Sequence, residues 1–179
     1  PDRGTLPAPR WDLRVGVPDK SELAFEVWRR LSARCLRTLA RRTVGYGPSQ
    51  GQPALRAAIA QHVSFARAVA CSADDVLVSA GAQQAFSLLA QVLVTPGRTV
   101  VAVEHPGYPP ARLAFEAAGA RIVPVPVDDE GLVVERLPAV ARVIVTTPAH
   151  QFPLGMAMSA ARRHALLAFA QRHGAVVVE

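Results

Sequence analysis

Apolar residues recur at two different spacings along this chain. Between residues 21 and 42 they follow one another mostly at intervals of three to four, and Ser21 stands at the start of the run. This spacing predicts an amphipathic helix that ends near Arg42. The residues VGYGPSQGQP at 44–53 interrupt the pattern, and Pro53 is placed to begin a second amphipathic helix through Leu55, Ile59 and Val63.

From Asp75 onward, short valine-rich runs alternate with helical segments. The runs predict strands at 75–79 (DVLVS), 99–103 (TVVAV), 121–125 (RIVPV), 142–146 (RVIVT) and 175–179 (AVVVE), and the segments between them predict helices at about 82–94, 109–118 and 159–173. Strands that are apolar on both faces and connected through helices are typical of a parallel sheet covered on both sides. The sequence therefore predicts a doubly wound, mostly parallel α/β domain.

Residues 1–20 are rich in proline and lack periodicity, so we expect a linker or an N-terminal arm there. The chain has no run of about 18 apolar residues and no signal-peptide pattern, which favours a cytoplasmic protein that does not enter a membrane. The net charge is +6, but all basic residues except Lys20 are arginines scattered singly or in pairs. Without a basic stripe interleaved with aromatic residues, we expect no direct nucleic-acid binding by this segment.

Three segments that follow predicted strands carry candidate chemistry. In VSAGAQQAF the amides of Ala82 and Gln83 open a helix after Gly81, where they can hold a phosphate; the alternative is that Gly81 only makes a tight turn. In VEHPGYPP the ring of Tyr108 can stack on a flat heteroaromatic ligand or pack under the proline turn.

The third segment, VTTPAHQFPLG, places His150 and Gln151 after another strand. Both side chains can hydrogen bond to a ligand, or they can be satisfied structural residues of a proline-rich loop. Because the carboxyl ends of parallel strands meet at one edge of the sheet, the three segments are expected to converge on one site.

Several segments, in this order, resemble one known group: GYGPSQGQPALRAAIA, VLVSAGAQQAFSLLAQVL, VEHPGYPPARLAF and TPAHQFPLG. They look like the aminotransferase-like part of MocR/GabR-type regulators, within the class I/II aminotransferases of fold type I, and the resemblance runs from about Val15 to Glu179. It implies that residues 21–179 are the N-terminal part of a large domain that binds pyridoxal 5'-phosphate. It also implies that Ala82 and Gln83 hold the cofactor phosphate, that Tyr108 stacks on the pyridine ring, and that Tyr46 reaches the phosphate of the neighbouring subunit in a homodimer.

The chain departs from the family pattern at two points. Where many members read Asn-Pro-Thr-Gly, this sequence has Phe152-Pro153-Leu154-Gly155, so Gln151 or His150 is the candidate to replace the asparagine that bonds the pyridine hydroxyl. Family members also continue past the last predicted strand to an aspartate that pairs with the pyridine nitrogen, and later to the lysine that bonds the cofactor covalently. Since Lys20 lies in the predicted arm, we expect this chain not to catalyse transamination by itself.

Three hypotheses about function remain open from the sequence. The first is a segment of an aminotransferase that moves amino groups between amino acids and keto acids in the complete protein. The second is the effector-sensing domain of a MocR/GabR-type transcription regulator, which would bind an amino acid or keto acid without turning it over. The third is an inactive remnant.

Overall fold

The computed structural model describes residues 21–41 and 45–179, and the chain divides into two compact units, Pro1–Gly47 and Pro48–Glu179. The first unit contains α1 (Phe25–Leu39). This helix begins four residues later than expected from Ser21, because the backbone of Ala24 is non-helical and the amide of Phe25 donates to the carbonyl of Leu23. The predicted arm at 1–20 and the expected helix end at Arg42 lie outside the described residues.

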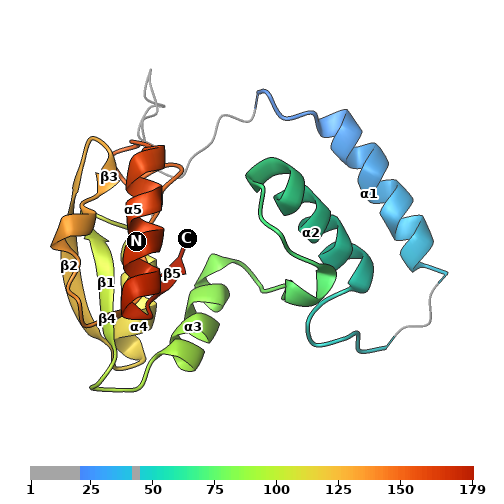
Figure 1. Ribbon diagram of the computed structural model, residues 1–179. Helices are drawn as coiled ribbons and strands as arrows, with labels where there is room; N and C mark the ends of the chain where they lie inside the picture. Colours follow the sequence, from blue (N-terminus) through green and yellow to red (C-terminus); the bar gives the residue numbers. More distant parts are fainter. Residues whose placement is uncertain (1–20, 42–44) are drawn as a thin grey trace, which may run out of the picture. The chain divides into compact units, whose positions relative to one another are not determined.

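The second unit is built on a five-stranded sheet (Figure 1). Its strands are β1 (Val100–His105), β2 (Arg121–Asp128), β3 (Gly131–Leu132), β4 (Ala141–Val145) and β5 (Val176–Val178), in the order β3-β2-β1-β4-β5. All pairings are parallel except that of β3, which returns antiparallel to β2. The mostly parallel α/β sheet is thus confirmed, and the short strand β3 is an element that the sequence pattern did not predict.

Helices cover both faces of this sheet. Ala90 of α3 (Ala82–Leu93) and Phe115 of α4 (Pro109–Ala117) belong to one buried cluster with Val101 and Val143. The alternate strand residues, such as Ala102 and Ile144, belong to a second cluster with Leu166 of α5 (Ala160–His173). Because successive strand residues face opposite sides of a sheet, α3 and α4 lie on one face and α5 on the other.

The remaining elements of the second unit are α2 (Pro53–Arg67) and the short 3-10 helices η1 (Ala73–Asp75) and η2 (Val134–Arg136). Pro53 opens α2 as the sequence predicted, since a proline at the first helical position has no amide hydrogen that needs a partner. Among the described residues no helix is long and apolar enough to cross a membrane.

The strand predicted at 75–79 is wrong. Asp75 ends η1, where the Ser72 hydroxyl accepts from the amide of Asp74 and the Asp75 carboxylate accepts from the amide of Ser72. Residues 76–79 form no strand in the described part of the chain; the amide of Val76 donates back to the carbonyl of Ala73 (3.3 Å), and the amide of Val78 donates to the carbonyl of Gln50 (2.9 Å). The valine-rich pattern was correct about an apolar segment, but a strand also needs a partner with which to pair.

A buried arginine holds this segment in place. Arg56 of α2 is 7% exposed, and its guanidinium donates to the carbonyl of Val76 (2.9 Å) and to the carboxylate of Asp74 (3.1 Å). A planar guanidinium can serve a carbonyl and a carboxylate together, so one side chain links α2 to η1 and to the residue that follows it.

A second arginine ties the β2–β3 turn to α5. Arg162 donates to both carboxylate oxygens of Asp128 (3.3 and 2.9 Å) and to the carbonyl of Leu132 (2.9 Å). The hydrogen bond from Arg162, followed by that from the amide of Glu130, lowers the pKa of the Asp128 carboxyl below its usual value. Asp128 is therefore part of a structural clamp.

This clamp predicts a pH dependence of stability. A carboxyl whose pKa is lowered by folding stabilises the fold above its unfolded value, about 3.9, and the stabilisation is lost as the pH falls through the lower folded value. Asp128→Asn should therefore lower the urea midpoint at neutral pH and reduce the loss of stability on acidification. Asp129→Asn, at the exposed neighbour, is the control. Equal loss of stability on acidification in Asp128→Asn and the wild type would refute this assignment.

The core predicts a contrast between two residues of α4. Phe115 is fully buried, whereas Leu113 is 52% exposed. Phe115→Ala should lower the free energy of unfolding by about 3–5 kcal/mol because it leaves a cavity between α4 and the sheet. Leu113→Ala should change it by no more than about 0.5 kcal/mol. Urea denaturation followed by circular dichroism measures both, and equal losses would contradict the placement of α4.

Candidate functional site

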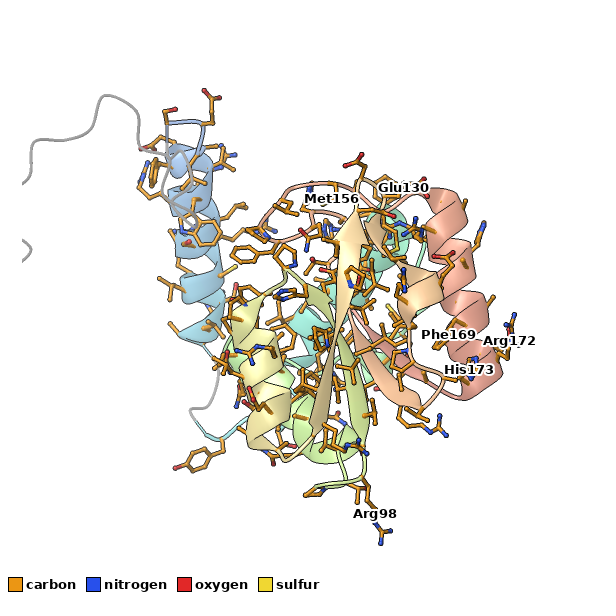
Figure 2. All side chains as sticks on the ribbon, turned by 90° about the vertical axis from the view of Figure 1, so that its left-hand side faces the viewer. Arg98, Glu130, Met156, Phe169, Arg172 and His173 are labelled. Atoms are coloured by element: carbon orange, nitrogen blue, oxygen red, sulfur yellow. The ribbon has the colours of Figure 1, made fainter. Side chains whose placement is uncertain are left out.

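The strand order reverses between β1 and β4. From β1 the chain passes through α4 to β2 on one side, and the later strand β4 pairs with β1 on its other side. In open α/β sheets, ligands bind in the crevice outside the carboxyl ends of the strands at such a reversal. In Figure 2 this edge of the sheet lies on the side of Glu130, which follows β2, and Met156, which follows β4. Arg98, which precedes β1, lies at the opposite edge.

A cavity of about 620 Å³ occupies this edge. Its lining includes the ends of β1 and β4 at Glu104, Thr146 and Thr147, together with Phe86 of α3 and Tyr108 before α4. Cavities of about 300–1,000 Å³ are the usual size for sites that hold a small molecule or cofactor. The segments that the sequence placed after successive strands therefore meet around one space.

Tyr108 is held by two other aromatic rings. It occupies the position before α4, which starts with Pro109. Its ring centroid lies 6.1 Å from that of Phe86 in a tilted arrangement and 5.4 Å from that of Phe152 in an edge-to-face arrangement. The side chain remains 38% exposed and lines the cavity. Tyr108 thus contacts two aromatic rings and keeps part of its surface accessible to a ligand.

The start of α3 offers free backbone donors. Gly81 adopts φ +95°, which favours glycine, and precedes the helix without a side-chain cap. In the described part of the chain the amides of Ala82 and Gln83 have no hydrogen-bond acceptor, whereas the amide of Ala80 donates to the side chain of Gln84. Phe86, one turn further along α3, lines the cavity. Two amides at a helix N-terminus form a natural anion site.

Gln151 lies at the same edge, but its amide group is already used. The residue is 2% exposed, and its Nε2 donates to the carbonyls of Pro106 (2.8 Å) and Phe152 (2.7 Å). Its Oε1 accepts from the amide of Leu154 (3.2 Å). His150, the alternative candidate, is exposed. Bonding of either side chain to a pyridine hydroxyl stays a prediction.

Glu104 is the residue at this edge that the sequence reasoning missed. It is 6% exposed at the end of β1, where its carboxylate accepts from Thr146, Thr147 and Gln151. The signal was present, because an acidic residue ends the otherwise apolar strand VVAVE. Strand patterns show which residue is buried, but they do not show which donors compensate it.

Tyr46 belongs to the first unit and is fully exposed, so its expected contact with a neighbouring subunit stays a prediction. Arg112 lines the cavity but donates to Glu116 one turn along α4 (3.0 Å). Lys20 lies outside the described residues.

Comparison with known proteins gives consistent matches. The model for the family Aminotransferase class I and II matches residues 11–178. The HTH-type pyridoxine biosynthesis transcriptional regulator PdxR of Corynebacterium glutamicum is 35% identical over 98% of this chain, and a probable rhizopine catabolism regulatory protein, MocR, of Rhizobium meliloti is 38% identical over 92%. The solved kynurenine aminotransferase of Pyrococcus horikoshii, in complex with PMP, superimposes on 92% of the chain with a TM-score of 0.82 and 28% identity.

The chain spans only part of each of these proteins. It covers 37% of PdxR, 33% of MocR and 43% of the kynurenine aminotransferase chain. The matches confirm the fold and the family group that the sequence motifs implied.

The turn that carries Tyr108 yields a prediction. A Cβ added at Gly107 would overlap the carbonyl oxygen of Glu104 and lie 2.9 Å from its carbonyl carbon. Gly107→Ala should therefore displace the turn and lower the free energy of unfolding by about 1–3 kcal/mol. Gly45→Ala is the matched control, since the space around Gly45 is open, and should change it by no more than about 0.5 kcal/mol. Equal stability of the two variants in urea would contradict the close approach at Gly107.

Proposed function

Since this chain belongs to the class I and II aminotransferase family, we propose that it forms the cofactor-binding part of an aminotransferase domain. The cofactor of this family is pyridoxal phosphate, and the whole protein would use it to transfer amino groups between amino acids and keto acids. The observation that carries the proposal is the meeting of Phe86 of α3, the accessible ring of Tyr108 and the ends of β1 and β4 around one cavity at the strand reversal.

The residues at this edge fit the cofactor. Its phosphate would be held by the unpaired amides of Ala82 and Gln83, where the partial positive charge of the α3 N-terminus favours an anion. Its flat ring would lie against Tyr108, whose orientation Phe86 and Phe152 restrict. The cavity volume of about 620 Å³ is sufficient for such a group.

When bound, pyridoxal phosphate supplies an electron sink for chemistry at the α-carbon of an amino acid. The described residues of this chain bind and orient the cofactor. Tyr108 and Phe86 would also line the cofactor cavity with aromatic surface. Gln151 contributes by holding the loop after β4, and Gln151 or His150 is the candidate contact for the ring hydroxyl.

The proposed assembly is a cytoplasmic homodimer. Tyr46 would reach the cofactor phosphate of the neighbouring subunit, and its complete exposure is compatible with that role. Helix α1 has no buried residue, and Phe25, Trp28, Leu31 and Leu39 recur along it at helical spacing. A partner subunit would cover such an apolar stripe.

A second candidate function is effector sensing in a transcription regulator. It is favoured by the 35% and 38% identity to two regulatory proteins, which exceed the 28% identity to the kynurenine aminotransferase. In this case the same site would bind an amino acid or keto acid as a signal. Turnover of an amino acid by the whole protein would favour the enzyme, whereas binding without turnover would favour the regulator.

A proline substitution tests the phosphate site. Ala82→Pro removes one amide donor at the first position of α3, where a helix tolerates proline, so the fold should persist. The affinity of the full chain for pyridoxal phosphate should fall by roughly tenfold or more, as expected for a hydrogen bond to a charged group. Absorbance and fluorescence titrations measure it.

The matched control is Ala160→Pro at the first position of α5, which should bind like the wild type. Pyridoxal without its phosphate should bind Ala82→Pro and the wild type equally weakly. If the wild type shows no saturable binding of pyridoxal phosphate, the proposed function is wrong. If Ala82→Pro binds as tightly as Ala160→Pro, the phosphate does not lie on α3.

A further inference from the structure

We infer that Glu104 is the positioning residue of this site: its buried carboxylate fixes the turn that carries Tyr108 relative to the loop after β4. The inference deepens the proposed function and rests on it only for the identity of the ligand. Glu104 is one of the few charged residues buried in the described part of the chain, and it lies at the strand reversal itself.

Four hydrogen bonds converge on the carboxylate. One oxygen accepts from the hydroxyl of Thr146 and from the amide of Thr147 (3.0 Å). The other accepts from the hydroxyl of Thr147 (2.7 Å) and from Nε2 of Gln151 (3.2 Å), which shares its two hydrogens between this oxygen and the carbonyls of Pro106 and Phe152. All donors come from the end of β4 and the loop that follows it, so a side chain of β1 organises the neighbouring segment.

The same donors connect this loop to the Tyr108 turn. Nε2 of Gln151 also donates to the carbonyl of Pro106 (2.8 Å), two residues before Tyr108. The hydroxyl of Thr147 in turn accepts from the amide of Phe152 (3.2 Å), and the Phe152 ring lies edge-to-face with Tyr108. Displacement of the carboxylate would therefore reach Tyr108 by two routes, through Pro106 and through Phe152.

The far end of the loop has a separate anchor. Arg163 of α5 donates to the carbonyls of Pro148 (2.8 Å) and Met158 (3.2 Å). This anchor does not involve Glu104, so removal of the carboxylate should loosen the cavity side of the loop and leave its attachment to α5 in place.

A carboxylate suits this position because all four of its neighbours donate to it in the structure. Glu104→Gln keeps the size of the side chain but replaces one acceptor oxygen with an NH₂ group. In one orientation this group faces the amide of Thr147, and in the other it faces Nε2 of Gln151. Neither of these two groups can accept, so the amide of Thr147 loses its acceptor in the first orientation, and the hydrogen bond to Gln151 is lost in the second.

The first experiment is hydrogen exchange on the full chain without ligand. In Glu104→Gln, exchange in peptides covering 105–109 and 147–155 should accelerate by about tenfold or more, while α5 and the β2–β3 turn keep their wild-type rates. Glu135→Gln, the same change at an exposed carboxylate in η2, is the control and should leave all rates unchanged. Wild-type exchange in both segments of Glu104→Gln would overturn the inference.

If Glu104→Gln does not fold, Thr147→Val and Thr147→Ser decide the same question. Valine removes the hydroxyl that donates to Glu104 and accepts from Phe152, whereas serine keeps it. Faster exchange at 147–155 in Thr147→Val, restored in Thr147→Ser, supports the inference. Equal rates in the two variants would overturn it.

The second experiment adds pyridoxal phosphate. Its affinity should fall by roughly tenfold or more in Glu104→Gln, and the induced circular dichroism for each bound cofactor should decrease because the ring is less firmly oriented. Unchanged affinity and dichroism, with accelerated exchange, would refute any effect of this positioning on the cofactor. Absence of binding in the wild type would refute the proposed function alone, and the exchange rates would still decide the role of Glu104.

Discussion

The parallel pairing of β1 with β4 is the constraint on which the site depends. Because the two strands run side by side in the same direction, their carboxyl ends open at the same edge of the sheet. The segment after β1 leads to α4 on one face, and the segment after β4 leads to α5 on the other. The two connections therefore separate, and the space between them becomes the cavity.

Local spacing was sufficient to predict most of the elements in the second unit. Pro53 and Pro109 open helices where the sequence placed them, and β1, β2, β4 and β5 fall on the expected valine-rich runs. The exception at 75–79 shows the limit of this reasoning. The apolar pattern of residues 76–79 depends on their own side chains alone. A strand also needs a second segment with which to pair, and no strand among the described residues pairs with residues 76–79.

The sequence predicted the location of the candidate site better than it predicted the hydrogen bonds made there. Tyr108 lies at the cavity because strand ends in a parallel sheet converge, which can be deduced from element order alone. The hydrogen bonds of Gln151 could not be deduced, since they depend on the carbonyls of Pro106 and Phe152 in a loop whose path the sequence does not encode locally. Glu104 escaped notice for the same reason.

The frame of the site and the covalent chemistry of the family involve different residues. The amides of Ala82 and Gln83, the Tyr108 ring and the Glu104 carboxylate all come from one compact unit, in which helix α3, two neighbouring aromatic rings and the donors of the loop after β4 position them. Under the proposed function, such a frame would lower the cost of binding, because little order would have to be imposed on these groups by the cofactor. If the proposed function holds, recognition and turnover would rest on different residues, and one frame could serve both an enzyme and a regulator that only senses its ligand.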